Sequence, residues 1–109
     1  MSSTPEGKVK IKIRLWLKNH MPNHWRVAPR GGPFGKIGCP DELICWMGVF
    51  IAIEVKSDTG TPSEAQYAQL QLIKRAGGVA AIVYGYDEVK LEKIKQAALD
   101  IAHGRLLNK

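Results

Sequence analysis

Eight consecutive residues near the middle of the chain, Val49-Phe-Ile-Ala-Ile-Glu-Val-Lys56, have the pattern of a strand that is buried on both faces. Side chains alternate along a strand, so one face carries Val49, Ile51, Ile53 and Val55, and the other carries Phe50, Ala52, Glu54 and Lys56. Both faces begin apolar, as is typical of a central strand. Glu54 and Lys56 then emerge together at its carboxyl end, where open α/β sheets bind ligands. A structural Glu–Lys pair would explain these two residues equally well.

The segments on either side of this strand predict a small mixed sheet. Glu42–Met47 precedes it as a second strand, and the two form a hairpin that turns at Gly48. After it, Thr61-Pro-Ser-Glu64 has capping-box spacing, with Pro62 at the first helical position, and predicts a helix to about Ala76 that stops at Gly77-Gly78. Val79–Tyr84 is a continuous apolar run, as expected of a buried strand. The strand–helix–strand order implies a parallel pair with a right-handed crossover.

The remaining segments supply two helices and an edge strand. Val9, Ile13, Trp16 and Leu17 share a helical face, although residues 8–17 also alternate like a strand. Thr4, Pro5 and Glu6 form a helix start signal, so we expect a helix from about Pro5 to Asn19. His24–Ala28 is a short candidate strand, residues 30–38 form a glycine-rich loop, and a last helix runs from about Glu88 to His103, with Asp87 as its cap and Gly104 as its stop. The fold class is therefore α/β.

Length and composition limit the kinds of protein that the chain can be. It has 109 residues, 45% of them apolar, and sixteen Lys and Arg against ten Asp and Glu give a net charge of +6. We expect a single domain spanning residues 1–109. No apolar stretch reaches the roughly 18–20 residues that cross a bilayer, no secretory signal begins the chain, and two cysteines make no disulfide framework. The prediction is a cytoplasmic protein with no membrane partner, whose positive charge favours an anionic partner such as nucleic acid.

Asp41 adds a second carboxylate to the candidate site. It follows Pro40 at the start of the first hairpin strand, and a hairpin turning at Gly48 would put it opposite about Val55, beside Glu54 and Lys56. Carboxylate and carbonyl oxygens are suitable ligands for Mg²⁺. The lysine could position or deprotonate an attacking water, or stabilise developing negative charge. This cluster indicates metal-assisted hydrolysis.

Together these residues resemble a known nuclease family. Pro40-Asp41, twelve residues, then Glu54-Val55-Lys56 resembles the PD-(D/E)XK pattern, which alone is short and degenerate. With Gly38-Cys-Pro-Asp41, Thr61, Gln66 and Ala76-Gly-Gly-Val-Ala-Ala-Ile-Val83, the chain resembles the virus-type replication-repair nuclease (VRR-NUC) domain from about Thr4 to Tyr84. The opening Thr4-Pro-Glu-Gly-Lys-Val-Lys10 is similar to stand-alone, phage-type members. The resemblance implies an αβββαβ restriction-endonuclease-like core, here followed by a C-terminal helix, and a phage-encoded protein acting in a bacterial host.

The resemblance also implies a role for individual residues. Asp41, Glu54 and the backbone carbonyl of Val55 would bind Mg²⁺, for which Mn²⁺ would substitute. Lys56 would be the catalytic lysine, and Glu6 would match an acidic position that binds metal directly or through water. Gln66 would match the glutamine that follows the lysine, and helical spacing with Leu70 and Ile73 independently directs it inward. The bland alternatives are a helix N-terminal charge for Glu6 and an ordinary polar helix residue for Gln66.

Other residues are weaker candidates. Four basic residues could contact DNA phosphates, or could simply be solvated surface charges: Arg30, Lys36, Lys74 and Arg75. A zinc site is not favoured for His20, His24, Cys39 and Cys45, because their spacing is atypical. Core packing is the better expectation for Trp16, Trp25 and Trp46 than stacking on bases.

The sequence thus predicts a Mg²⁺-dependent DNA endonuclease. The resemblance implies a structure-specific enzyme that resolves four-way (Holliday) junctions, and the two symmetric cuts of a junction would need a homodimer with one site in each chain. Two alternatives remain open: a nuclease of flaps or ordinary duplex, and a catalytically silent DNA-binding module of the same fold.

Overall fold

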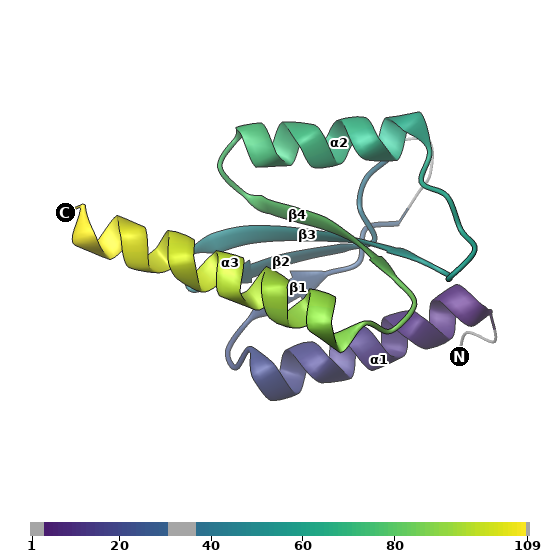
Figure 1. Cartoon of the computed structure of the whole chain (residues 1–109), viewed down its shortest axis with the longest axis horizontal. Helices are drawn as coiled ribbons and strands as arrows, with labels where there is room; N and C mark the ends of the chain where they lie inside the picture. Colours follow the sequence, from purple (N-terminus) through teal and green to yellow (C-terminus); the bar gives the residue numbers. More distant parts are fainter. Residues whose placement is uncertain (1–3, 31–36, 109) are drawn as a thin grey trace.

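The computed structural model describes residues 4–30 and 37–108, and these form a four-stranded sheet with helices on both faces (Figure 1). In chain order the elements are α1 (Pro5–His20), β1 (Trp25–Val27), β2 (Glu42–Trp46), β3 (Val49–Lys56), α2 (Glu64–Arg75), β4 (Val79–Tyr84) and α3 (Glu88–Leu107). The α/β fold class and the predicted order of elements are confirmed. Within the described ranges, no helix is both long and apolar enough to cross a bilayer.

The sheet is mixed and has the strand order β1-β2-β3-β4. Neighbouring strands are antiparallel up to β3, and β4 runs parallel to β3. Figure 1 shows α2 on one face, with α1 and α3 on the other. The larger core lies on the α1 and α3 side and includes Ile13, Leu17, Ile53, Val83 and Leu91, whereas Ala52, Leu70 and Ala80 form a small core under α2. The strand β3 therefore has apolar contacts on both faces, as its sequence predicted.

The first helix begins with the predicted cap. Thr4 Oγ1 accepts a hydrogen bond from the backbone N–H of Gly7 at 3.0 Å, and Pro5 occupies the first helical position. The helical face predicted from the sequence buries Trp16, and Trp46 of β2 is buried as well. Trp25 is different: it is 61% exposed on the edge strand β1, so the expectation of core packing was wrong for this tryptophan. An edge strand has a neighbour on one side only, and α2 covers the other end of the sheet.

The hairpin between β2 and β3 fixes the register at the candidate site. Met47 and Gly48 both have positive φ, at 53° and 73°, as a two-residue hairpin turn requires. Glu42 consequently pairs with Ile53, and continuing this register places Asp41 opposite Glu54. The sequence-based register was wrong by one residue, because Met47 belongs to the turn rather than to the strand.

Two helix boundaries also differ from the prediction. The capping box of α2 is formed by Ser63 and Gln66 rather than by Thr61 and Glu64, so the helix starts later. The helix α3 continues through Gly104 to Leu107, and Arg105 Nη1 donates to the carbonyl of Gly48 at 2.7 Å. This contact with the hairpin turn favours the extra turn over a stop at Gly104. On the same helix Leu91 is buried and Val89 is exposed, so Leu91 is the apolar residue that the first turn packs into the core.

Candidate active site

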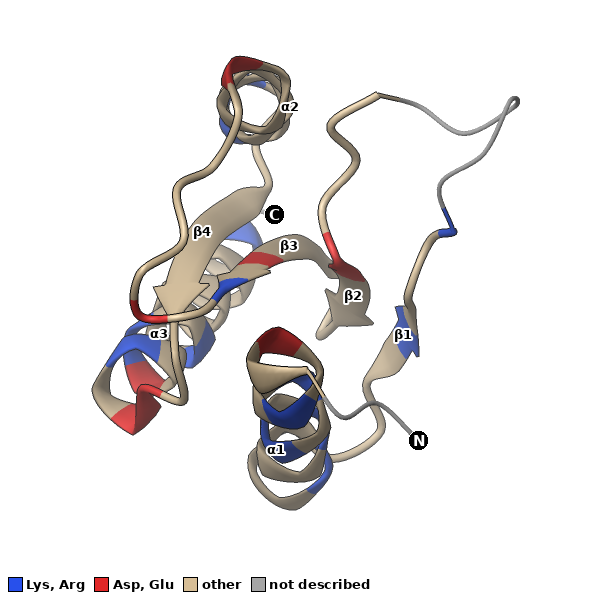
Figure 2. Ribbon diagram, turned by 90° about the vertical axis from the view of Figure 1, so that its right-hand side faces the viewer, with Lys and Arg blue, Asp and Glu red and all other residues tan. Residues whose placement is uncertain are grey.

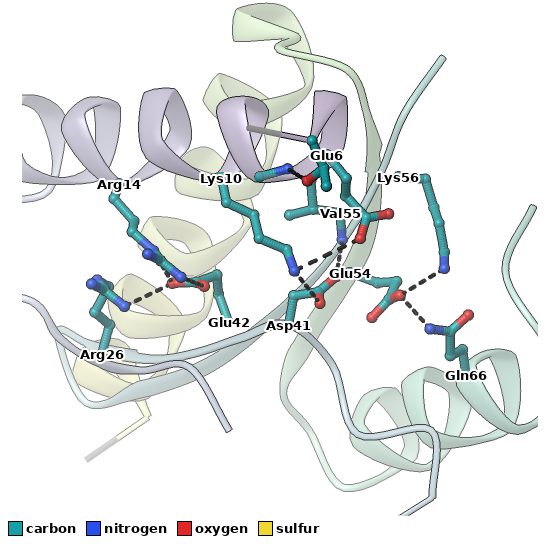
Figure 3. A network of polar contacts seen from close by, with 12 residues as sticks. Glu6, Lys10, Arg14, Arg26, Asp41, Glu42, Glu54, Val55, Lys56 and Gln66 are labelled. Carbon is teal, nitrogen blue, oxygen red and sulfur yellow. Dashed lines mark hydrogen bonds and ion pairs between the residues drawn. The ribbon is translucent and has the colours of Figure 1, made fainter. Parts of the chain in front are cut away.

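Three residues predicted to form the site come together at the carboxyl end of β3 (Figure 3). Asp41 Oδ2 accepts a hydrogen bond from the backbone N–H of Val55 at 2.7 Å. Lys56 Nζ lies 3.3 Å from Glu54 Oε2, on the face of the sheet that α2 covers. The hairpin register and one backbone hydrogen bond therefore place the two carboxylates and the lysine at the same strand end.

Glu54 is the least compensated of these groups. Its side chain is 1% exposed, and Oε2 accepts from Gln66 Nε2 at 2.6 Å as well as facing Lys56. Its other oxygen, Oε1, is buried and has no hydrogen-bond partner. Burial, and then the negative charge of Asp41, raise the pKa of Glu54 to about 7 against the opposing effect of Lys56. A buried carboxylate with one unsatisfied oxygen is costly for folding alone, so this position is well suited to accept a cation.

The neighbouring buried carboxylate shows the opposite arrangement. Glu42 is fully buried on the α1 face, where Arg14 Nη2 lies 2.9 Å from Oε2 and Arg26 Nη1 lies 2.9 Å from Oε1. Arg14 Nε also donates to Oε1 at 3.3 Å. This network was not predicted from the sequence. Its signal was that Glu42 shares the inward face of its strand with Ile44 and Trp46, where a carboxylate needs a cationic partner.

Asp41 forms an ion pair with a lysine of α1. Lys10 Nζ lies 2.9 Å from Asp41 Oδ1 and 3.8 Å from Glu6 Oε2. Partial burial lowers the pKa of Lys10, but its bond to Asp41 and the nearby acidic groups outweigh this effect and raise it. The sequence analysis did not select Lys10, although its spacing of four residues from Glu6 on one helix was visible. Glu6 therefore lies near Asp41, but with the lysine in contact with both.

The carboxylates at this site supply only part of the ligand set that a hard divalent cation needs. No group of three or more His, Cys, Asp or Glu side chains gathers within the part of the chain that the structure describes. Asp41 and Glu54 supply two carboxylates, and Glu6 does not join them in one cluster. Such a pair, completed by backbone oxygen and water, is typical of Mg²⁺ sites. The side chains considered for zinc do not form a cluster either: His20 stacks on Trp16, and Cys45 is exposed.

The loop before Asp41 packs directly on the first turn of α2. Gly38 has φ of +78°, and a Cβ at this position would lie 2.5 Å from the carbonyl carbon and oxygen of Ala65 and 2.9 Å from the backbone nitrogen of Gln66. Only glycine permits both this backbone conformation and this approach. The contact fixes the distance between the segment that carries Asp41 and the helix that carries Gln66.

Three of the four residues predicted to contact DNA lie in the described part of the chain, and none of these three pairs with Asp41 or Glu54. Arg30 is exposed before the glycine-rich segment, and Lys36 lies outside the described residues. Lys74 and Arg75 are exposed in the last turn of α2, roughly 12 Å along the helix axis from Gln66. Among the described residues, the basic side chains that pair with Asp41 and Glu42 are instead Lys10 and Arg14 of α1 and Arg26 of β1.

Comparison with solved structures defines the fold class. The chain is similar to a structure described as "VRR_NUC domain", with a TM-score of 0.66 and 19% identity over 86% of this chain and 94% of the other. A second structure, described as "VRR_NUC domain protein", gives a TM-score of 0.64 and 19% identity over 89% and 90% of the two chains. No family model and no curated protein sequence matches the chain. The chain has the VRR-NUC fold, as its motifs implied.

Proposed function

We propose that the chain is a metal-dependent DNA endonuclease that hydrolyses phosphodiester bonds, with Mg²⁺ as its metal. The observation that carries this proposal is the unpartnered, buried Glu54 Oε1, which lies at one strand end with Asp41 and Lys56. The carboxylate of Glu42 is satisfied by two arginines, whereas an unsatisfied carboxylate beside a second one favours metal binding. The fold shared with VRR_NUC domain structures supports a nuclease.

Asp41, Glu54 and the carbonyl of Val55 would hold the ion. When bound, Mg²⁺ would polarise the scissile phosphate and make a water a stronger nucleophile at neutral pH. Gln66 keeps Glu54 in position by donating to Oε2, which leaves Oε1 as the oxygen available to the metal. Glu6 would act at most through water, because Lys10 lies in contact with both Glu6 and Asp41.

Lys56 is the group that would act on the reacting atoms. Its side chain is 16% exposed and its ammonium lies against Glu54, so the residue stands at the border between the carboxylates and solvent. From this position it can orient the attacking water or donate a hydrogen bond to the negative charge that develops on the phosphate oxygens.

The proposed substrate is a four-way DNA junction cut by a homodimer. This finer proposal rests on the resemblance to stand-alone VRR-NUC members and on symmetry, since two symmetric cuts require two copies of a chain with one site. Flap or duplex cleavage uses the same site and is the alternative. A silent DNA-binding module is disfavoured, because it would have no need of an unsatisfied buried carboxylate.

Cleavage of labelled DNA tests the proposal directly. The substrates are a four-way junction, a flap, a linear duplex and a single strand, each with Mg²⁺ and with EDTA, and Asp41→Ala serves as the inactive control. Paired, metal-dependent cuts in the junction alone would support the whole proposal. Cutting of every substrate would support the nuclease activity and contradict the specificity for junctions. Tight binding without any cutting would favour the catalytically silent DNA-binding module.

The dimer has a separate test. Light scattering of the protein, free and bound to a junction, should give twice the mass of one chain in at least one of the two states. A monomer in both states would contradict the proposed homodimer but would not bear on the proposed nuclease site.

A further inference from the structure

A basic groove between α1 and β1 lies beside the carboxylates proposed to bind metal and contains none of them. It has a volume of about 420 Å³ and is lined by Ile11, Arg14, Leu15, Lys18, His24 and Arg26. Figure 2 shows Lys and Arg along α1 and on the adjacent strand β1. Arg14, Lys18 and Arg26 give this groove three positive charges. Among the described residues, the fully buried Glu42 is the only carboxylate that forms ion pairs with the two arginines.

Glu42 holds both arginines in a fixed orientation. Arg14 uses Nε and Nη2, and Arg26 uses Nη1, to bind the two oxygens of this one carboxylate. A guanidinium carries five N–H donors, so each arginine keeps donors beyond these bonds. Both side chains are about one-third exposed, at 34% and 32%, and therefore face the groove as well as Glu42.

The charge of the groove favours a polyanion. Arg14, Arg26 and Lys18 against Glu42 leave a local charge of +2, and the fork geometry of arginine matches phosphate oxygens. Lys10, Arg14 and Lys18 follow one another at four-residue spacing on α1, which is about 6 Å per step along the helix axis. The row starts at the lysine that contacts Asp41, so it leads from the groove to the carboxylates of the site.

We propose that this groove binds the phosphodiester backbone of a DNA strand whose scissile phosphate lies at Asp41 and Glu54. The inference rests on the proposed function and names its substrate-binding surface. Arg14, Lys18 and Arg26 contact phosphates, and the apolar side chains of Ile11 and Leu15 line the groove beside the sugars. Glu42 is a positioning residue, because it acts only through the two arginines.

DNA binding without cleavage tests the groove. Fluorescence anisotropy of a labelled duplex and a labelled junction in EDTA, over a series of salt concentrations, gives the affinity and its salt dependence. Lys18→Ala should weaken binding several-fold and reduce the slope of log K against log salt by about 0.9, the value for one phosphate contact. Lys12→Ala is the matched control, because Lys12 lies on the same helix but its Nζ is 6.0 Å from the Tyr86 ring, toward α3.

Two further variants separate orientation from charge. Arg26→Lys keeps the charge but loses the fork, and should also weaken binding. Glu42→Gln removes a negative charge, so a purely electrostatic patch would bind DNA more tightly, whereas loss of oriented guanidiniums makes binding weaker. Circular dichroism checks that Glu42→Gln folds, and if it does not, Lys18→Ala and Arg26→Lys decide.

The outcomes also separate the groove from the nuclease. Wild-type affinity and salt slope in both Lys18→Ala and Arg26→Lys would contradict the proposal that the groove binds DNA, whether or not the protein cuts DNA. If these variants bind DNA more weakly but the wild-type protein never cuts DNA, the groove is supported as a DNA-binding surface and the proposed nuclease activity is contradicted.

Discussion

Gln66 links the first turn of α2 to the carboxylate at the end of β3. Its Nε2 donates to Glu54 Oε2 at 2.6 Å, while its Oε1 accepts from the backbone N–H of Ser63 at 2.8 Å. Both ends of the amide are therefore engaged, and the capping box determines which end faces Glu54. The same interaction starts the helix and directs Glu54 Oε1 toward the position proposed for the metal.

Gln66→Ala should lower cleavage far more than it lowers stability. The variant loses the hydrogen bond that orients Glu54 and also half of the capping box, whose loss costs about 1 kcal/mol. Ser63→Ala is the matched control, because it removes the capping hydroxyl and leaves the Gln66–Glu54 bond in place. Urea unfolding should give similar losses for the two variants, and cleavage rates should fall at least about tenfold in Gln66→Ala alone. Equal activities would reduce Gln66 to a helix cap.

Asp41→Asn and Glu54→Gln should abolish cleavage and keep DNA binding. Each exchange keeps the shape of the side chain but removes the negative charge of a proposed metal ligand, so we expect a rate loss of at least about 100-fold, the order found for a single electrostatic contact in a transition state. Mg²⁺ should raise the melting temperature of the wild type and fail to raise that of either variant. Glu92→Gln, on the exposed side of α3, is the charge-matched control. Near wild-type cleavage in either site variant would remove that carboxylate from the mechanism.

Stability should fall with rising pH because of Glu54. Its pKa is about 7 in the folded protein and near 4.5 when unfolded, so the folded state binds more protons between these values. The stabilisation is complete below pH 4.5 and is lost as the pH rises through 7, amounting to at most about 3 kcal/mol. The free energy of unfolding in EDTA should therefore decrease from pH 5 to pH 8 in the wild type relative to Glu54→Gln. Parallel pH profiles for the two proteins would show that Glu54 is ionised throughout.

Gly38→Ala should damage the site from outside it. The new Cβ would have to occupy space 2.5 Å from the carbonyl of Ala65, at a φ that costs an L-residue about 1–2 kcal/mol. Either the loop that carries Asp41 or the first turn of α2 must move, so melting temperature and cleavage should both decrease. Gly48→Asn is the control, because Gly48 also has positive φ but a Cβ added there would meet nothing within 4 Å, and asparagine tolerates this conformation. A fully active, stable Gly38→Ala protein would mean that the contact is adjustable.

Local patterns predicted the elements of the fold, because each depended on signals within a few residues. The alternation of Val49–Lys56, the cap at Thr4 and the glycines after α2 all act over one or two turns of chain. What failed were the points at which two local signals competed. Ser63 and Thr61 are both capable caps, and Met47 could end a strand or enter a turn. In α2 the observed cap at Ser63 brings with it the tertiary hydrogen bond between Gln66 and Glu54, which local patterns do not reveal.

The part of the candidate site that lies on β3 and on the segment leading into β2 could be predicted from the sequence. Asp41, Glu54 and Lys56 come together through the hairpin register, which the sequence spacing predicted to within one residue, and through the hydrogen bond from Val55 to Asp41. The contribution of α1 was not predictable in this way, because Lys10 and Arg14 reach the carboxylates only through the packing of a helix that is distant in sequence. DNA-binding residues were therefore expected on loops and on α2, whereas the described basic residues that pair with Asp41 and Glu42 lie on α1 and β1.

Lys10→Ala should tighten Mg²⁺ binding in the absence of DNA. The ammonium lies 2.9 Å from Asp41 Oδ1 and thus occupies a position where a metal ion would approach this carboxylate. Removing it leaves the negative charge of Asp41 uncompensated and frees Oδ1, so the Mg²⁺ dissociation constant measured by calorimetry should decrease several-fold. The loss of this partly exposed ion pair costs no more than about 1 kcal/mol of stability. Lys8→Ala, exposed on the same helix, controls for the change in net charge. A dissociation constant that is unchanged or larger in Lys10→Ala would mean that the lysine and the metal do not compete, and that Lys10 supports the position of Asp41 instead.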